Sequence, residues 1–417
     1  MTDATAERGP DRLLRLVEQV TGPLPAPWRA AFEHVPRDAF LPDVIWLRRA
    51  DGLPDHEPCE RATDPDRWED AAWSDVPAVI QVCDGRVPES GEPAWASSSV
   101  SQPSIVAETL LMLDVRDRHR VLEIGTGAGW FAGLLAHRLG GDNVVTIEVD
   151  RELATAARGR LDALGLRPLV VAGDGAEGWA DGAPYDRLVG TCAVARVPWA
   201  WLEQVAPGGL IVTPWTTSWA AYGNLVLTPR QGGGATGRFA HGGAFMAMRG
   251  HRSRVYDVAD VVGSHDLPDP STTTLSPWDV AGGDRRAEAV MGLVLPGLWT
   301  HWNDDPGVDG VRSRLWVGDD ALTSWATVDY DGRRLDTFRL RQHGPRRLWD
   351  EVAAAWSRWN SVGRPAFDTF GLDIDPDGTQ TVWCGTPGGP SWPISAGSPG
   401  SAARAPSRRE AGRGVIR

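Results

Sequence analysis

The residues best suited to hold a ligand form a glycine-rich turn. In VLEIGTGAGW (residues 121–130), Gly125, Gly127 and Gly129 alternate with other residues, a spacing that lets the backbone turn sharply against a bound molecule. The spacing differs from the G-x-G-x-x-G fingerprint of dinucleotide-binding proteins. Because the chain contains no lysine, a phosphate-binding loop with its conserved Lys is excluded.

Three acidic residues stand at the ends of successive predicted strands. Glu123 precedes the first glycine by two positions, Glu148 ends the next strand, and Asp174 follows the strand after that. A carboxylate at the Glu148 position can accept hydrogen bonds from two ribose hydroxyls, and Asp174 is placed to meet an adenine amino group. The pattern favours S-adenosylmethionine over a nucleotide phosphate; the alternative is a set of glycine turns with incidental surface acids.

The elements that must position these residues alternate between strand and helix. The apolar patterns predict strands at 120–125, 143–150, 168–174, 185–191 and 208–214 and helices at 11–20, 104–113, 130–140, 151–165 and 198–205. Alternation at this spacing indicates an α/β fold with a central, mostly parallel sheet that is covered on both faces.

The pattern changes after about residue 250. Residues 314–344 predict antiparallel strands, residues 346–363 a helix, and residues 367–385 a hairpin that turns at Asp377–Gly378. We therefore expect four parts: a flexible arm (1–10), a catalytic domain (11–250), a C-terminal α+β domain (251–393) and a disordered tail (394–417). Within the catalytic domain, residues 51–95 are rich in Pro, Asp and Glu and predict a long, partly ordered excursion.

Composition excludes several classes of protein. The net charge of −13 argues against nucleic-acid binding. The four cysteines are far apart and form no C-x-x-C pair, which argues against a zinc site or a disulfide framework. The polar N-terminus is unlike a secretory signal, and the apolar run at 289–299 is too short to cross a bilayer. We expect a cytoplasmic, monomeric protein that binds no metal.

Beyond these patterns, residues 35–214 resemble the protein-L-isoaspartate O-methyltransferases. The matching segments keep the family's order and spacing, and SVSQPSIVA (99–107) is more specific than the glycine turn because the family has a Thr-Ile-Ser-Gln-Pro-like segment there. The resemblance implies a Rossmann-like class I methyltransferase that uses S-adenosylmethionine and releases S-adenosylhomocysteine. The matching segments are VPRDAFLP (35–42), AWSDVP (72–77), SVSQPSIVAETL (99–110), VLEIGTGAGW (121–130), VVTIEVD (144–150), AGDGAEGW (172–179), YDRLVGTCA (185–193) and APGGLIVTP (206–214).

The resemblance also assigns roles to residues. Ser101 corresponds to the active-site serine, whose hydroxyl lies beside both the methyl donor and the acceptor carboxylate; the alternative role for Ser101 is to cap the helix that starts near Pro103. The implied acceptor-binding residues are Ser99, Val100, Gln102, Ile105 and Val106. The implied cofactor-binding residues are Ser101, Glu123, Gly125, Thr126, Gly127, Gly129, Glu148, Val149, Asp174, Gly175 and Thr191.

The chain departs from the family around the acceptor. It continues for roughly 200 residues beyond the methyltransferase core, and TCAVARVP (191–198) replaces a proline-bearing stretch of the family. In having this extension, the chain resembles the C-terminally extended variants associated with ribosomally synthesised modified peptides. The tryptophans of the extension either form a peptide-binding groove or are simply the hydrophobic core of the C-terminal domain. We therefore expect methylation of an Asp or isoAsp carboxylate in a dedicated peptide, followed by cyclisation to aspartimide. The alternatives are a general isoaspartate repair enzyme with an accessory domain and a non-catalytic peptide-binding protein.

Overall fold

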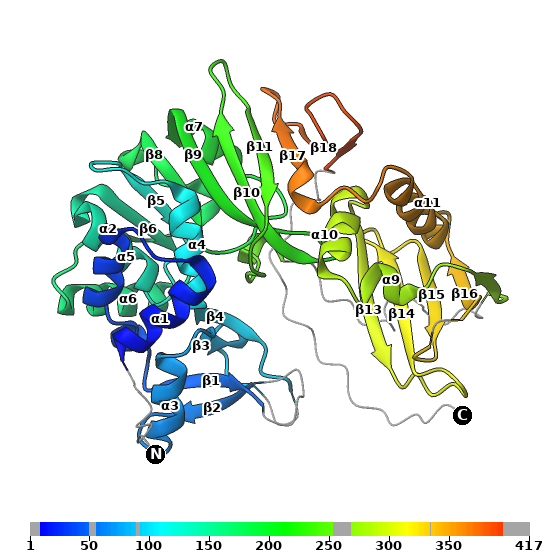
Figure 1. The fold of residues 1–417 in the computed structure, drawn as a ribbon, viewed down its shortest axis with the longest axis horizontal. Helices are drawn as coiled ribbons and strands as arrows, with labels where there is room; N and C mark the ends of the chain where they lie inside the picture. Colours follow the sequence, from blue (N-terminus) through cyan, green and yellow to red (C-terminus); the bar gives the residue numbers. More distant parts are fainter. Residues whose placement is uncertain (1–8, 50–55, 89–91, 253–267, 334, 395–417) are drawn as a thin grey trace.

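The computed structural model describes residues 9–49, 56–88, 92–252, 268–333 and 335–394. Within them, Figure 1 shows a large sheet with helices on the N-terminal side of the molecule, a small sheet below it, and a second α+β part at the other end of the long axis. The predicted tail (394–417) lies, apart from its first residue, outside the described residues. Of the predicted arm (1–10), only the last two residues are described, and Pro10 already begins helix α1 (Pro10–Thr21).

The large sheet has ten strands in the order β19-β18-β17-β11-β10-β9-β8-β5-β6-β7. The strands from β7 to β9 pair in parallel, and those from β9 to β19 pair in antiparallel fashion. The strands are β5 (Val121–Ile124), β6 (Val144–Glu148), β7 (Leu169–Ala172), β8 (Tyr185–Gly190), β9 (Val205–Thr216), β10 (Ala221–Pro229), β11 (Ala235–Ala240), β17 (Phe370–Ile374), β18 (Gln380–Cys384) and β19 (Ser391–Pro393).

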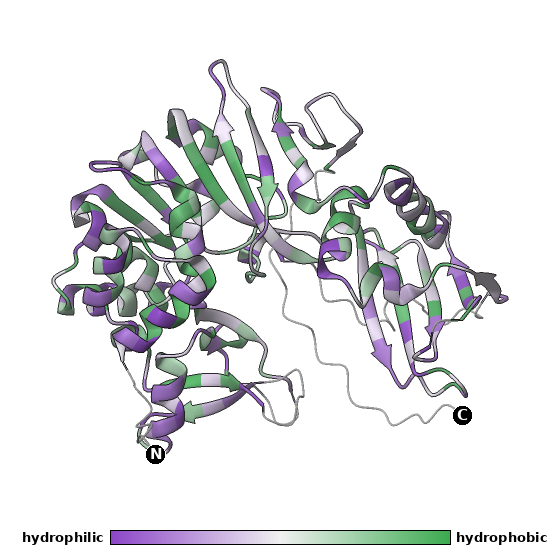
Figure 2. Cartoon of the chain, viewed as in Figure 1, coloured by the Kyte–Doolittle hydropathy of each residue, from purple (hydrophilic) through white to green (hydrophobic). Residues whose placement is uncertain are grey.

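The central parallel strands β5 and β6 are buried on both faces, as their mostly apolar sequences predict. Every residue of β5 and β6 is buried. Alternate residues point to opposite hydrophobic clusters, with Val121 on the face of helices α4 and α5 and Leu122 on the other face. Figure 2 shows hydrophobic residues concentrated along these strands. The helices around the parallel strands are α2 (Ala26–His34), α4 (Pro103–Leu113), α5 (Trp130–Leu139), α6 (Arg151–Ala163) and α7 (Trp199–Gln204).

Residues 51–95 are more ordered than the sequence predicts. Their described part contains helix α3 and two strands, β2 and β3. These strands belong to a four-stranded antiparallel sheet in the order β2-β1-β3-β4. Trp68 is 2% exposed, so an aromatic core holds together a segment whose Pro and acidic residues suggested a loop. The elements are β1 (Val44–Arg48), β2 (His56–Glu60), α3 (Pro65–Ala72), β3 (Ala78–Val82) and β4 (Ala96–Val100).

The C-terminal part contains a five-stranded antiparallel sheet in the order β12-β16-β15-β14-β13. The predicted strands in 314–344 and the helix in 346–363 are confirmed. Trp299, Trp316, Trp325 and Trp349 are buried, so these tryptophans belong to the core rather than to a groove. The elements are β12 (Ser271–Thr273), α9 (Pro277–Ala281), α10 (Arg285–Val294), β13 (Leu298–Asp304), β14 (Ser313–Asp319), β15 (Trp325–Tyr330), β16 (Phe338–His343) and α11 (Leu348–Ser361).

The predicted limit at residue 250 does not coincide with the limits of the sheets. The hairpin in 367–385 forms as predicted, but β17 pairs with β11 of the large sheet rather than with the C-terminal sheet. In addition, α10 packs against β10, and one hydrophobic cluster contains residues of both parts. Strands β17, β18 and β19 therefore extend the sheet that carries the glycine turn.

Candidate active site

A cavity of about 530 Å³ lies where β5 and β6 end, beside β4 and the start of α4. This is the carboxyl edge of the parallel strands, where open α/β sheets bind ligands, and the volume is typical of small-molecule sites. Every residue that the sequence assigned to the site lines this cavity except Gly129. These residues are Ser99, Val100, Ser101, Gln102, Ile105, Val106, Glu123, Gly125, Thr126, Gly127, Glu148, Val149, Asp174, Gly175 and Thr191.

The glycine turn needs its glycines for two different reasons. Gly125, Gly127 and Gly129 have φ angles of +105°, +53° and +94°, in the left-handed region that side chains disfavour. A Cβ on Gly125 would also lie 2.7 Å from Thr191 Oγ1. A Cβ on Gly129 would lie 3.2 Å from Ala157 Cβ, so Gly129 lets α5 approach α6 and does not face the cavity.

Glu148 ties the glycine turn to the next strand. Its Oε2 accepts the Gly127 N–H at 2.8 Å, and its Oε1 accepts the Asp150 N–H at 3.0 Å. Burial raises the pKa of Glu148, while these two backbone donors and Arg249 lower it. An ionised carboxylate has about four acceptor positions, so the two N–H bonds fix its orientation and leave capacity for ribose hydroxyls.

Glu123 is a buried carboxyl group with no hydrogen-bond partner among the described residues. The Thr146 hydroxyl lies near Glu123 and pairs with the Thr126 hydroxyl at 2.6 Å, with either hydroxyl able to be the donor. Burial raises the pKa of Glu123 to about 8, with Thr146 opposing the rise and Glu148 adding to it. A buried acceptor that lacks a donor is costly unless a ligand supplies one. A cationic group, such as the ammonium of S-adenosylmethionine, fits this requirement.

Asp174 and Thr191 stand on the loops after β7 and β8. Asp174 Oδ1 accepts the Ala176 N–H at 2.9 Å and its side chain is exposed to the cavity mouth. Thr191 donates its hydroxyl to the Ile124 and Gly125 carbonyls, so it supports the turn from behind. These positions, with the unpaired Glu123 and the close-fitting Gly125, fit the methionine and adenosine parts of the cofactor.

The acceptor side of the cavity is formed by the end of β4 and the first turn of α4. Ser101 does not cap that helix. Asp75 does so from a distant loop, since its Oδ1 accepts the Ser104 N–H at 2.7 Å and its Oδ2 accepts the Gln102 side-chain N–H at 3.1 Å. The Ser101 hydroxyl makes no hydrogen bond to the described residues, which leaves it available to an acceptor in the cavity. Gln102, by contrast, has its amide committed to Asp75 and Ser104.

Arg37 holds the backbone behind Ser101, a role that sequence reasoning missed. Its guanidinium is fully buried and donates to the carbonyls of Val100 and Ser101 at 3.2 and 3.4 Å. It also donates to four carbonyls at and after the end of α3, those of residues 71, 72, 74 and 76. Burial lowers the pKa of Arg37 to about 9, and Asp75 opposes the change. The segment VPRDAFLP, which contains Arg37, was the available signal.

A second missed group is the stretch that follows β11. Residues 244–250 and Arg252 line the cavity, together with Arg48 and His56 from the small sheet. Sequence patterns did not indicate this role, because the stretch has no helical or strand-like periodicity. Among the described residues, no cluster of His, Cys, Asp or Glu has the arrangement of a metal site. None of the helices in the described residues is long and apolar enough to span a membrane.

The sheet order and the acid-lined cavity at the ends of β5 and β6 define the fold of a class I S-adenosylmethionine-dependent methyltransferase. Residues 60–235 match the family described as Protein-L-isoaspartate(D-aspartate) O-methyltransferase (PCMT). A protein-L-isoaspartate O-methyltransferase of Rhodospirillum rubrum is 33% identical over 209 residues, which are 49% of this chain and 78% of the relative. A second such enzyme, from Shewanella sediminis, is 38% identical over 53% of this chain and 75% of the relative.

The chain therefore belongs to the protein-L-isoaspartate O-methyltransferase family, whose members are S-adenosylmethionine-dependent carboxyl methyltransferases. A relative from Ignicoccus hospitalis is 42% identical over 29% of this chain, and the match spans only 59% of that relative. A solved structure of a protein-L-isoaspartate O-methyltransferase aligns with a TM-score of 0.50 at 19% identity. That alignment covers 90% of this chain and all of the other, so the shared fold reaches into the C-terminal half.

Proposed function

We propose that this chain methylates the free carboxylate of isoaspartyl residues in proteins or peptides. The observation that carries the proposal is that one cavity brings together an uncommitted hydroxyl, Ser101, and an unpaired buried carboxyl, Glu123. The first suits an anionic acceptor and the second a cationic methyl donor. The names of the relatives agree with this chemistry.

The chain's own residues have a positioning task. S-adenosylmethionine, when bound, supplies an electrophilic methyl group. The acceptor carboxylate is already ionised at neutral pH, so no general base is required. Ser101 donates a hydrogen bond that orients one carboxylate oxygen, and Glu123 and Glu148 hold the other reactant. Orientation of two reactants in this way accounts for a large share of many enzymatic rate accelerations.

The ester product explains the biological use of the reaction. A methyl ester is a better electrophile than a carboxylate, so the next backbone nitrogen attacks the ester carbonyl and expels methanol, which gives a five-membered succinimide. Hydrolysis of the succinimide returns part of the isoaspartate to aspartate. In this proposal the chain repairs proteins and peptides that have undergone that isomerisation.

A second candidate is methylation of one Asp or isoAsp in a dedicated modified peptide, with retention of the aspartimide. The acceptor side favours it, because TCAVARVP (191–198) differs from the proline-bearing stretch of the family and its first two residues, Thr191 and Cys192, line the cavity. The extension itself does not favour it. The solved relative aligns over 90% of this chain, so an extended fold also occurs in a protein named as an isoaspartate methyltransferase.

Mass spectrometry with S-adenosylmethionine tests the two candidates. The substrates are a generic isoaspartyl peptide, its aspartyl isomer, and candidate precursor peptides. Repair predicts a gain of one methyl group on the isoaspartyl peptide alone, followed by loss of methanol. The dedicated-peptide candidate predicts methylation of one precursor peptide and no reaction with the generic isoaspartyl peptide.

Ser101→Ala supplies the matched test of mechanism. Loss of one orienting hydrogen bond is expected to lower kcat/KM by about 10- to 100-fold. The affinity for S-adenosylhomocysteine is expected to change less, because Glu123 and Glu148 are intact. If neither class of peptide is methylated by the native chain while the cofactor binds, a peptide-binding protein without catalysis replaces both candidates.

A further inference from the structure

Residues 243–252 form a strap, most of which lines the cavity, and it contacts five parts of the fold: α4, the turn after β3, and the segments after β6, β7 and β8. At its start, a Cβ on Gly243 would lie 2.4 Å from Ile105 Cδ1 of α4, so the strap packs closely against the acceptor helix. In its middle, Ala193 donates its N–H to the Met246 carbonyl and accepts the Met248 N–H, at 2.8 and 2.9 Å. Met248 also packs beside Gly175. The strap therefore covers both reactant sides of the cavity.

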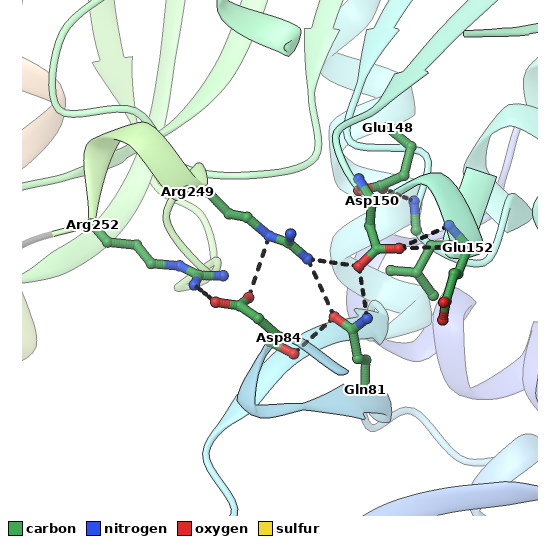
Figure 3. A network of polar contacts seen from close by, with 10 residues as sticks. Gln81, Asp84, Glu148, Asp150, Glu152, Arg249 and Arg252 are labelled. Atoms are coloured by element: carbon green, nitrogen blue, oxygen red, sulfur yellow. Dashed lines mark hydrogen bonds and ion pairs between the residues drawn. The ribbon is translucent and has the colours of Figure 1, made fainter. Parts of the chain in front are cut away.

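The end of the strap is held by ion pairs, which Figure 3 shows. Arg249 Nη2 lies 3.0 Å from Asp150 Oδ2, and Arg249 Nε lies 3.3 Å from Asp84 Oδ1. Arg252 Nη1 lies 2.7 Å from Asp84 Oδ2. Asp84 belongs to the turn after β3 of the small sheet, whereas Asp150 follows β6 of the large sheet. Arg249 thus links the strap to both sheets.

The bridge continues to the cofactor side. Asp150 Oδ1 accepts the N–H groups of Glu152 and Leu153 and so caps α6, while Gln81 Nε2 donates to Asp150 Oδ2 at 3.0 Å. The Asp150 N–H in turn donates to Glu148, and Glu148 accepts the Gly127 N–H. A continuous set of polar contacts therefore runs from the glycine turn to the strap. The orientation of Glu148 depends on where Asp150 is held.

We propose that Arg249 is a positioning residue that fastens the strap across the cavity and couples the cofactor side to the acceptor side. The inference rests on the proposed function, since it concerns the same cavity. Arg249 acts through Asp150 and Glu148 on the methyl donor and through the strap on the peptide. Its loss weakens the binding of both reactants and spares the chemical step once both are bound.

The charges around Glu148 give this role a signature. The titratable groups that face it are Glu123 on β5, Asp150 after β6, Cys192 after β8 and Arg249 on the strap. Of these, Arg249 is the cation, and its charge lowers the pKa of Glu148. Binding through an ionised Glu148 is lost as the pH falls through its pKa. Removing the cation raises that pKa, so the loss begins at a higher pH.

Titration calorimetry with S-adenosylhomocysteine, between about pH 5 and 8, tests the proposal on the full chain. Arg249→Gln is expected to raise the Kd about three- to tenfold at neutral pH, in line with the loss of a partly exposed ion-pair network. It is also expected to move the acid limb of the profile to higher pH. Arg249→Lys keeps the charge but cannot span both aspartates. Its acid limb should match the native one although its Kd is raised.

Steady-state kinetics complete the test. Both variants are expected to raise the KM for an isoaspartyl peptide by a similar factor and to keep kcat within about twofold. Arg116→Gln, which changes an exposed arginine that does not line the cavity, is the control and should match the native chain. Native affinity and an unshifted pH profile in Arg249→Gln would overturn this inference alone. Failure of the native chain to bind S-adenosylhomocysteine would overturn the proposed function as well.

Discussion

The two sides of the cavity are built in different ways. On the cofactor side, most groups come from a turn and from strand ends, namely residues 121–130 and the ends of β6 and β7, and Thr191 and Arg249 support them. On the acceptor side, Ser101 sits in a short segment that other parts of the chain hold in place. Asp75 caps its helix, Arg37 binds its carbonyl, and the strap covers it. The first side is specified mostly by local sequence and the second mostly by tertiary contacts, so substitutions far from the cavity should act more on the second.

Arg37→Met is expected to have the largest effect of the remaining substitutions. It leaves the carbonyls of Val100, Ser101 and the end of α3 without their donor inside the protein. The free energy of unfolding should fall by about 3–5 kcal/mol. Urea denaturation measures this change.

A matched variant, Arg116→Met, alters an exposed arginine and should leave the urea midpoint unchanged. At a temperature where Arg37→Met stays folded, its KM for the peptide should rise more than its Kd for S-adenosylhomocysteine. Equal losses on both sides would mean that the acceptor segment is not separately supported.

Gln380→Ala tests how far the extension supports the cavity. Gln380 is 2% exposed on β18, where its Oε1 accepts the Val197 N–H at 3.1 Å and its Nε2 donates to the Val197 carbonyl at 2.7 Å. Val197 closes the loop that carries Thr191 and Cys192. Leaving the N–H and the carbonyl of Val197 unpaired should lower the free energy of unfolding by about 2–3 kcal/mol. Thermal unfolding measures this change.

Thr381→Ala, one residue further on, is the control because its side chain is only partly buried. The point substitution is a sharper test than removing the residues after 250. Such a truncation deletes β17–β19 and exposes the edge of β11, so lost peptide selectivity could not be separated from a damaged sheet. An unchanged melting temperature in Gln380→Ala would show that the loop stands without the extension.

Glu123→Gln has the smallest expected effect on the fold and addresses the cofactor side. The pKa of Glu123 is about 8 in the folded chain, above its unfolded value. Its contribution to stability is therefore fully present below the unfolded pKa and is lost as the pH rises toward 8. Glu123→Gln should flatten the stability profile over that window.

The same carboxyl should report on the ligand. An ammonium group beside Glu123 favours its ionised form, so binding of S-adenosylmethionine at pH 7 should release close to one proton. Calorimetry in buffers of different ionisation enthalpy counts that proton. The native chain and Glu123→Gln should differ by this release, and the absence of a difference would remove Glu123 from the cofactor site.

The local character of the cofactor side explains why it was predictable. The apolar pattern predicted strands β5 and β6, and the glycine spacing predicted the turn. The positions of residues 123, 148 and 174 near strand ends predicted the acids of the site, and the structure brings all of these together. The acceptor side was found only through the resemblance of residues 99–107. Arg37 and Asp75 were not assigned roles because most of their partners are backbone groups, which give no periodic pattern in the sequence.

The parts that sequence patterns misjudged share a cause. Residues 51–95 looked loop-like, yet Trp68 and its neighbours form a core there. The hairpin in 367–385 was expected in the C-terminal domain, yet it pairs with β11. Both results depend on which element the apolar face of a strand or helix packs against. The periodicity of the sequence does not contain that information. The domain limits and the roles of the site residues stay predictions that the experiments above address.

The pairing of β11 with β17 also sets an order of events during synthesis. About 130 residues separate the two strands, so at about 5–20 residues per second the ribosome needs roughly 7–26 seconds to deliver the second after the first. Throughout that interval the edge of β11 has no neighbour. An unpaired edge is a site where chains associate wrongly. The nascent chain therefore carries an aggregation hazard after the cofactor-binding half is complete and before β17 pairs with β11.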